Sequence, residues 1–269
     1  MTDNNTIRIA TEANRNAWNE SALHHRDTEW WHEMVSIIAN PDFSSFDTTM
    51  TEALKQMKLG GKSVVQLGCN NGREVLSLPA YGAKSALGID QSDAFIDQAR
   101  ELGEIAQKPV TFLCANIYDL PTDTPRGFDV AMITIGVLSW MPDLPGFFHT
   151  VAGLLSKGGQ IIIYETHPFL ELFNPKASNP YQLEFSYFQT EPSIEAEVIT
   201  YDGSTHEGGV ESYWYTHTIS HIFTSMLDAG FLITKFEEFA HSNREIEYAV
   251  YENRPAQIPM CYILQAAKG

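Results

Sequence analysis

The sequence predicts an α/β fold built around a mostly parallel sheet with helices on both faces. Apolar runs of strand length alternate with helical patterns over residues 60–168, an alternation that is typical of parallel sheets covered by helices. One of these runs passes through a glycine-containing turn directly into a helical pattern, as in ligand-binding strand–helix units. A chain of 269 residues is also long enough to bury a large core within one unit.

The first strand–helix turn, residues 64–72 (VVQLGCNNG), predicts a nucleotide site. Its apolar strand runs into a turn at which Gly68 and Gly72 let the backbone approach a ligand closely, and the start of the expected helix offers free N–H groups. A second expected strand, residues 85–90, ends in Asp90. Because a carboxylate in that place can bind both hydroxyls of a ribose, we expect an adenosine-containing cofactor.

The spacing of this turn separates two classes of cofactor. Dinucleotide folds carry G-x-G-x-x-G, whereas here Asn70 stands at the middle position and Arg73 stands where the third glycine belongs. The pattern resembles the first motif of class I S-adenosylmethionine-dependent methyltransferases, an acidic residue followed by x-G-x-G-x-G, with Gln66 in the acidic position. Gln66 can accept a hydrogen bond but brings no charge. A P-loop is excluded, because no G-x-x-x-x-G-K-[ST] occurs.

The resemblance to this methyltransferase family continues in chain order to residue 168. Residues 110–121, 127–133 and 154–164 resemble its third, fourth and fifth strands, and residues 134–140 resemble the stretch under the methionine portion. The family implies a Rossmann-like, seven-stranded sheet, with S-adenosylmethionine as cofactor, S-adenosylhomocysteine as product and no metal. The positions that the resemblance, with the geometry of a strand edge, places at the cofactor are Gln66, Gly68, Cys69, Asn70, Gly72, Asp90, Gln91, Asn116, Ile117, Ile135 and Gly136.

The chain divides into four predicted parts. Helical periodicity at the start, strand–helix alternation in the middle and irregular, aromatic sequence after it set the boundaries. The parts are an N-terminal helical cap (1–59), the S-adenosylmethionine-binding core (60–168), an inserted lid at the acceptor site (169–213) and a C-terminal helix with strands that complete the core (214–269). The insertion is interpreted as a lid because so long an irregular connection is uncommon unless it is functional.

Outside the core, periodicity predicts individual elements. Alternating polarity at 183–188 and at 195–201 predicts a hairpin within the lid. The other expected elements are cap helices at 14–24, 28–40 and 48–59, a helix at 216–229 ended by Gly230, and an antiparallel pair of strands at 231–239 and 261–267.

Three residues are candidates for acting on the methyl acceptor. Glu165 and His167 lie two apart before Pro168, which ends the fifth strand, so their side chains point to one side. A carboxylate and an imidazole there could orient or deprotonate an acceptor, or could form a hydrogen-bonded pair that shapes the pocket wall. His217 is the third candidate. His221 lies four residues beyond it, but spacing fixes no third ligand, so no metal site is expected.

Aromatic side chains are candidates for contact with the acceptor. They are Trp18 and Trp140, which could border the methyl-transfer pocket, and Tyr187, Phe188 and Trp214, in or next to the insertion. Two interpretations remain open for the aromatic residues of the insertion. They form the hydrophobic underside of a lid, or Tyr187, Phe188 and Trp214 line a pocket for an aromatic or cationic small molecule.

The composition disfavours several classes of partner. Thirty-four acidic against 17 basic residues give a net charge of −17, which opposes binding to a phosphate backbone. No apolar run reaches the roughly 18 residues that a membrane span needs. Three cysteines without CxxC spacing indicate reduced core residues of a cytoplasmic protein.

The sequence therefore predicts methyl transfer to an O, N or S atom of a small molecule by in-line displacement, in a monomer or homodimer that binds neither nucleic acid nor membrane. Two alternatives use the same core: a methyltransferase that modifies proteins, and a protein that binds S-adenosylmethionine without catalysis. The second alternative stays open because Gln66 and Asn70 differ from the acidic residue and the middle glycine of the family's motif. Arg73 disfavours an NAD-dependent oxidoreductase.

Overall fold

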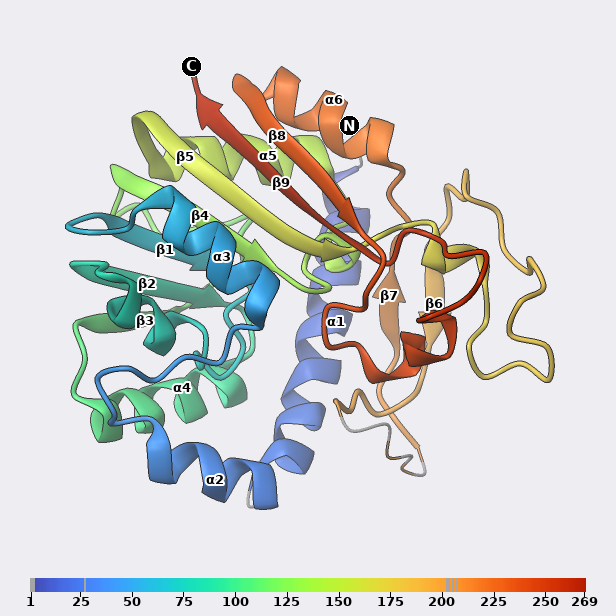
Figure 1. Cartoon of the computed structure of the whole chain (residues 1–269), viewed down its shortest axis with the longest axis horizontal. Coiled ribbons are helices and arrows are strands. Elements are labelled where there is room, and N and C mark those ends of the chain that lie inside the picture. The colour runs from blue at the N-terminus through green and yellow to red at the C-terminus, as the bar shows by residue number, and fades with distance from the viewer. Residues whose placement is uncertain (1–2, 27, 202–203, 205, 207) are drawn as a thin grey trace.

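A seven-stranded sheet forms the centre of the computed structural model, which describes residues 3–26, 28–201, 204, 206 and 208–269. The strand order is β3-β2-β1-β4-β5-β9-β8, and β9 runs antiparallel to the other six strands of this sheet. The strands are β1 (Ser63–Leu67), β2 (Ser85–Asp90), β3 (Val110–Cys114), β4 (Phe128–Thr134), β5 (Leu155–Thr166), β8 (Phe231–Phe239) and β9 (Cys261–Lys268). The predicted fold class and the final antiparallel pair are confirmed (Figure 1).

Helices cover both faces of the sheet because the central strands are apolar on both sides. Phe147 and Met226 bring α5 and α6 against one face, which includes Ala131 of β4. Met50 brings α3 against the other face, which includes the next residue of β4, Met132. The helices are α1 (Asn4–His25), α2 (Glu29–Ile37), α3 (Thr48–Met57), α4 (Asp93–Ala106), α5 (Leu144–Leu154) and α6 (Ile219–Asp228), with short 3-10 helices η1 (Val75–Tyr81), η2 (Leu138–Trp140), η3 (Leu170–Leu172) and η4 (Ile246–Tyr251).

The N-terminal helices form as predicted, although α1 begins earlier than its apolar periodicity indicates. The Asp3 carboxylate caps α1 by accepting from Thr6 N, and the Thr28 hydroxyl caps α2 by accepting from Trp31 N. In Figure 1, α1 runs between the sheet and the small β6–β7 pair, and it packs against α4 and β7. The cap thus lies beside the edge at which the parallel strands end.

The hairpin predicted for 183–188 and 195–201 is wrong. The insertion instead pairs β6 (Ser193–Glu195) with β7 (Ser212–Trp214), and Leu183 forms an isolated bridge with Phe173. The reason lies in α1, because the Asn14 side chain accepts from Tyr213 N and donates to Tyr213 O. This contact with a distant helix aligns β7, and alternating polarity within the insertion does not contain that information.

The helix after the glycine turn also differs from the prediction. It is the 3-10 helix η1 rather than an α-helix, and it contains Pro79, which has no N–H to donate. It ends at Gly82, whose φ of +88° is left-handed. The N–H groups of residues 69–73, in the turn before this helix, all donate to acceptors within the chain, so the free donors expected there are not found.

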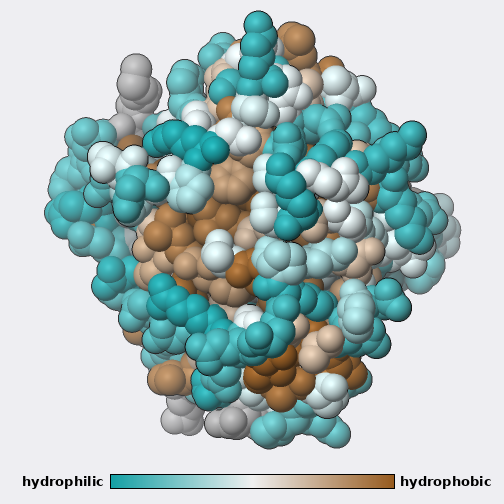
Figure 2. Space-filling view, turned by 90° about the vertical axis from the view of Figure 1, so that its left-hand side faces the viewer, coloured by the Kyte–Doolittle hydropathy of each residue, from teal (hydrophilic) through white to brown (hydrophobic). Residues whose placement is uncertain are grey.

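The end at which the parallel strands begin has a mostly hydrophilic surface. Figure 2 views the molecule from the side at which these strands begin, where hydrophilic side chains dominate and hydrophobic ones gather near the middle. No helix within the described ranges has both the length and the apolar character needed to cross a bilayer. The predicted site residues lie at the opposite edge, where the strands end.

Candidate functional site

The glycine turn after β1 has the close backbone geometry that a cofactor cradle requires. Gly68 has a φ of +65°, and a Cβ there would lie only 2.6 Å from Val137 Cγ2. Asn70 also has a left-handed backbone, with a φ of +51°, a conformation that asparagine tolerates better than most residues. The turn therefore leaves no room for a side chain at Gly68, which keeps the backbone accessible there.

Asp90 ends β2 beside this turn. Its Oδ2 accepts from Asn70 N at 2.8 Å and its Oδ1 accepts from Ser92 N at 2.9 Å. Burial raises the pKa of Asp90, although both of these hydrogen bonds act in the opposite direction. The structure thus places a carboxylate at the glycine turn, as predicted, and Gln91 follows it directly.

The residues predicted at the adenine end follow β3. Asn116 Oδ1 accepts from Tyr118 N at 3.0 Å, and its Nδ2 donates to Thr11 of α1 at 3.2 Å. Ile117 is buried in the core, as is Cys69 in the turn. Asn116 is therefore oriented by its own turn and by the cap.

Gln66 belongs to a buried polar network. Its Nε2 donates to Glu74 at 2.7 Å and to Thr134 at 3.0 Å, while its Oε1 has no hydrogen-bond partner among the described residues. Glu74 also accepts from Thr134 at 2.6 Å and from Arg244 at 2.7 Å. An unpartnered buried oxygen beside the glycine turn fits a cofactor that carries a hydrogen-bond donor.

The segment between β4 and α5 is held by two of the predicted catalytic residues. Glu165 accepts from Gly136 N at 2.5 Å and from Leu138 N at 3.0 Å. Burial raises the pKa of Glu165 to about 8, against the effect of these two hydrogen bonds. His217 Nε2 bonds to the Met141 carbonyl at 2.9 Å, so this nitrogen carries the proton. Both side chains therefore fix the backbone around Gly136.

His167 lies apart from this segment. Its Nδ1 accepts from Phe169 N at 3.1 Å, and its Nε2 lies 3.0 Å from Glu238 of β8. Burial lowers the pKa of His167, and Glu238 opposes this effect. His167 and Glu165 do not form the pair that was one interpretation of the sequence. The structure instead engages both ring nitrogens of His167 at the end of β5.

Three tryptophans gather beside Gly136, as the sequence suggested. The ring centroids of Trp18 and Trp140 are 5.3 Å apart, and those of Trp140 and Trp214 are 4.9 Å apart. A Cβ built on Gly136 would meet Trp140 and Trp214 at 3.8 and 3.9 Å. Two indole rings thus lie in van der Waals range of a side-chain position at Gly136.

Tyr187 and Phe188 are not brought to this tryptophan cluster by any ring contact among the described residues. The Tyr187 hydroxyl accepts from Ile219 N at 3.0 Å, at the start of α6. Phe188 packs on Tyr187 and is 77% exposed. Their predicted contact with an acceptor stays a prediction.

Sequence reasoning missed four side chains that the structure brings to this edge: Glu74, Glu171, Tyr201 and Arg244. Glu171 accepts from the Trp214 indole N–H at 2.9 Å, and burial raises the pKa of Glu171 to about 7. The Tyr201 hydroxyl accepts from Asn70 Nδ2 at 2.9 Å. Only Glu74, just beyond the glycine turn, carried a local signal, since the other three come from the C-terminal hundred residues.

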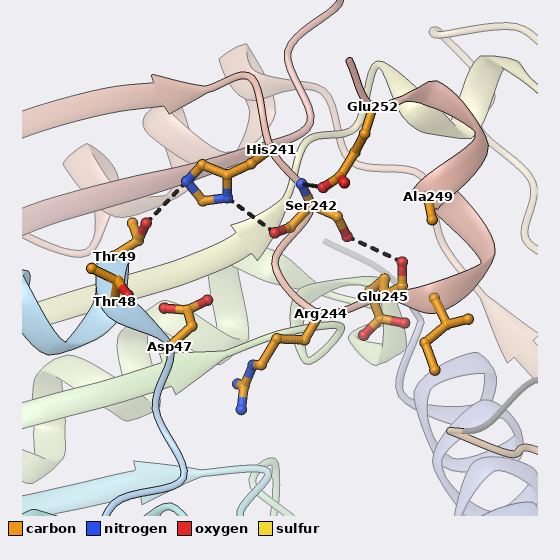
Figure 3. Close-up of a pocket in the computed structure, with 10 residues that line it drawn as sticks. Asp47, Thr48, Thr49, His241, Ser242, Arg244, Glu245, Ala249 and Glu252 are labelled. Atoms are coloured by element: carbon orange, nitrogen blue, oxygen red, sulfur yellow. Dashed lines mark hydrogen bonds between the residues drawn. The ribbon is translucent and has the colours of Figure 1, made fainter.

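A cavity of about 490 Å³ opens at the same edge, between the start of α3 and the β8–β9 loop (Figure 3). Asp47, Glu245 and Glu252 contribute carboxylates to its lining, and His241 and Arg244 contribute basic groups. Burial raises the pKa of Glu245 to about 7. No three His, Cys, Asp or Glu side chains in the described part of the chain are grouped so as to hold a metal ion.

The sequence of this chain is similar to that of a known protein family and of several curated proteins. Residues 65–163 match the family described as "Methyltransferase domain". Over 107 residues the chain is 31% identical to a ubiquinone biosynthesis O-methyltransferase of Coxiella burnetii, covering 40% of this chain and 44% of that protein. Over 156 residues it is 26% identical to a tRNA U34 carboxymethyltransferase of Colwellia psychrerythraea, covering 54% of this chain and 42% of that protein. The chain thus spans less than half the length of these curated relatives.

The fold is shared more widely than the sequence. The solved structure of an S-adenosylmethionine-dependent methyltransferase from Clostridium acetobutylicum is similar with a TM-score of 0.59. The similarity covers 90% of this chain and 98% of that one, at 15% sequence identity. This likeness concerns the fold alone.

Proposed function

We propose that this chain, whose residues 65–163 match a methyltransferase domain, is a class I S-adenosylmethionine-dependent methyltransferase that transfers a methyl group to an O, N or S atom of a small molecule. One observation carries the proposal. The Asp90 carboxylate, the side-chain-free turn at Gly68 and the unpartnered Gln66 oxygen lie together where β1 and β2 end. In the proposed complex, Asp90 would bind the ribose, the backbone at Gly68 would contact the cofactor, and the Gln66 oxygen would accept from its amino group.

The residues fit the cofactor from end to end. Asp90 would hold the ribose, Asn116 would face the adenine, and Gly136 would lie along the methionine portion. When bound, S-adenosylmethionine supplies a methyl carbon open to displacement. The chain's own contribution is alignment, because in-line displacement depends mainly on holding the acceptor atom opposite the leaving sulfur.

The surface beside Gly136, next to the tryptophan cluster, is the proposed acceptor site. Trp140 and Trp214 border it, and Glu171 fixes the Trp214 ring by accepting its indole N–H. Glu165 and His217 hold the backbone under it through Gly136, Leu138 and Met141. We propose that these two side chains position the site, because the described structure commits both Glu165 oxygens to backbone N–H groups.

A small acceptor is favoured because the cap and the insertion cover the cofactor turn. Ser21 of α1 donates to the Ile199 carbonyl, and Tyr201 then lies against Asn70. A macromolecule would have to displace this cover before it reached the turn. The net charge of −17 also opposes a nucleic-acid acceptor, and the ubiquinone-pathway relative is named for an O-methyl transfer.

The tRNA-modifying relative supports the competing candidate, a nucleic-acid acceptor. We also propose that the protein is a monomer or a homodimer and that it is located in the cytoplasm. The location is supported by three free thiols, at Cys69, Cys114 and Cys261.

Binding of S-adenosylhomocysteine, measured by calorimetry, tests the cofactor assignment. Asp90→Ala is expected to weaken binding about 10- to 100-fold, since it removes hydrogen bonds from a charged acceptor. Asp97→Ala is the matched control, because Asp97 is an exposed carboxylate that pairs only with Arg100. Equal affinity of the wild type and Asp90→Ala would contradict the assignment.

Methyl transfer from isotope-labelled S-adenosylmethionine tests the acceptor class. The label is followed into the small-molecule, protein and tRNA fractions of a cell extract, with Asp90→Ala as the control. Label in the small-molecule fraction supports the proposal, and mass spectrometry then identifies the acceptor. Label only in protein or tRNA would replace the small-molecule acceptor by a macromolecular one.

A further inference from the structure

We propose that Arg244, in the loop between β8 and β9, is a positioning residue that orients the Gln66 amide toward the amino group of the cofactor. This inference rests on the proposed function. Arg244 lies 170 residues beyond Glu74, through which it acts. A loop that lines the 490 Å³ cavity would thereby control the methionine end of the cofactor site.

The first step of the argument is the orientation of Gln66 itself. Gln66 is 1% exposed, and its Nε2 is committed to Glu74 and Thr134 at 2.7 and 3.0 Å. Its Oε1 is left without a partner in the described structure. A buried carbonyl oxygen is costly unless a donor completes it. The ammonium group of the methionine portion is such a donor, whereas the amide NH2 in the same place would oppose it.

The second step is the charge of Glu74. An ionised carboxylate only accepts hydrogen bonds, so it holds the NH2 side of Gln66 and leaves the oxygen facing away. Burial alone would raise the pKa of Glu74, but Arg244, Arg73 and the Thr134 hydroxyl together lower it. Arg244 makes the direct contact, with its Nη2 2.7 Å from Glu74 Oε1.

The third step is the way in which the loop presents Arg244. Its φ of +80° is left-handed, a conformation that is costly for a residue with a side chain. Its Nη1 donates to the Ser45 carbonyl at 2.7 Å, which ties the segment before α3 to the same guanidinium. In Figure 3 the side chain extends from the loop away from His241 and Glu252. The loop thus directs Arg244 to Glu74.

Loss of Arg244 would reverse this orientation. Without its direct ion-pair partner, buried Glu74 would take up a proton more readily. Its hydroxyl would then donate to the Gln66 oxygen, and the amide would turn its NH2 toward the cofactor's ammonium group. Ligands that carry the amino group would therefore bind more weakly, whereas the affinity of ligands that lack it would not change.

Calorimetry with two probes tests this selectivity. S-adenosylhomocysteine contains the amino-acid portion, whereas 5′-methylthioadenosine has only the adenosine and the sulfur. Arg244→Met is expected to weaken S-adenosylhomocysteine about 10- to 100-fold, the effect of one hydrogen bond to a charged group, and to leave methylthioadenosine within about twofold. Arg244→Lys is expected to restore part of the loss, because it keeps the charge but not the planar fork.

Arg254→Met is the matched control, since Arg254 is an exposed arginine of the same loop that stacks on Tyr181. It should change neither affinity. If Arg244→Met does not fold, the Glu74→Gln/Arg244→Met variant removes the uncompensated charge, and the same selective loss of S-adenosylhomocysteine is expected from it.

An equal loss of both probes would overturn the proposal, because Arg244 would then stabilise the site as a whole. Unchanged binding of both would overturn it too. Failure of the wild-type chain to bind S-adenosylhomocysteine would instead contradict the proposed function, so the two failures are distinguishable.

Discussion

The Tyr201 hydroxyl accepts a hydrogen bond from the Asn70 side chain at 2.9 Å, across 131 residues of sequence. The contact joins the insertion after β5 to the cofactor turn after β1. Asn70 occupies the position at which the resembling family carries a glycine, so this chain can make a contact that a glycine could not. The Tyr201 ring also packs on His25, with centroids 4.5 Å apart. The presence of Asn70 in place of the family's glycine is therefore explained by closure of the insertion over the turn.

Removing this contact should speed dissociation of S-adenosylhomocysteine. Tyr201→Phe and Asn70→Gly each remove one side of the same hydrogen bond, which contributes about 1 kcal/mol, or roughly a fivefold change in rate. Stopped-flow displacement measures the rate. The double variant should be no faster than either single one, because the two residues share one interaction.

Tyr213→Phe is the control for this prediction, since the Tyr213 hydroxyl bonds only to Glu211 at the surface. Additive effects of Tyr201→Phe and Asn70→Gly would show that the two side chains act independently. That result would contradict closure through this contact.

The core could be predicted from the sequence because its signals are local. Gly68 and Asp90 follow directly from the strands that position them, and apolar runs define β1, β4 and β5. The insertion could not be predicted in the same way. Its strand β7 is aligned by Asn14, which lies 199 residues before Tyr213, and a pattern of alternating polarity contains no record of such a partner. The predicted hairpin failed for this reason.

The candidate site also has a part that could be predicted from local sequence and a part that could not. Its cofactor half rests on a recurring motif. Trp18, Trp140 and Trp214 are each expected near the acceptor, but their mutual contact depends on α1, η2 and β7, which lie far apart in the sequence. The direction of a side chain was not predictable. Glu165 contacts Gly136 and His167 contacts Glu238, because each finds a partner on a different neighbouring segment.

Gly68→Ala should destabilise the fold through two separable effects. The φ of +65° costs a non-glycine residue about 1–2 kcal/mol. A Cβ only 2.6 Å from Val137 adds an overpacking cost of about 1–3 kcal/mol. In a Val137→Ala background the overpacking cost should disappear, so Gly68→Ala should there cost only the backbone part.

Urea unfolding of the wild type, Gly68→Ala, Val137→Ala and the double variant measures this difference in the free energy of unfolding. Gly60→Ala is the control, because a Cβ at Gly60 meets nothing within 4 Å. An equal cost of Gly68→Ala in both backgrounds would mean that Val137 does not restrict the turn.

Glu165→Gln should loosen the segment between β4 and α5. Above its raised pKa of about 8, the ionised Glu165 carboxylate accepts from both Gly136 N and Leu138 N. An amide presents one oxygen and one NH2, so at such a pH one of these bonds must break in the variant. Amide hydrogen exchange of residues 134–141 should become about tenfold faster, as expected for the loss of one such bond. Glu104→Gln is the control, since Glu104 is an exposed residue of α4, away from this segment. Unchanged exchange would contradict the positioning function of Glu165.

His217 should make the stability of the fold depend on pH. Burial lowers the pKa of His217 to about 4, with the neighbouring His221 acting in the same direction, whereas a histidine in an unfolded chain titrates near 6.5. Between these values the unfolded chain binds a proton that the folded chain does not. The contribution of His217 is therefore fully present above pH 6.5 and is lost as the pH falls toward 4, by roughly 3 kcal/mol in all.

His217→Gln keeps a donor for the Met141 carbonyl but cannot titrate. Its free energy of unfolding should therefore fall less than that of the wild type when the pH is lowered from 7 to 4.5, as measured by denaturant unfolding at both pH values. His149→Gln, at an exposed site on α5, should retain the wild-type dependence. If His217→Gln and the wild type lost the same free energy over this interval, His217 would have to be able to take up a proton inside the folded chain. Burial would then not be what keeps the imidazole neutral.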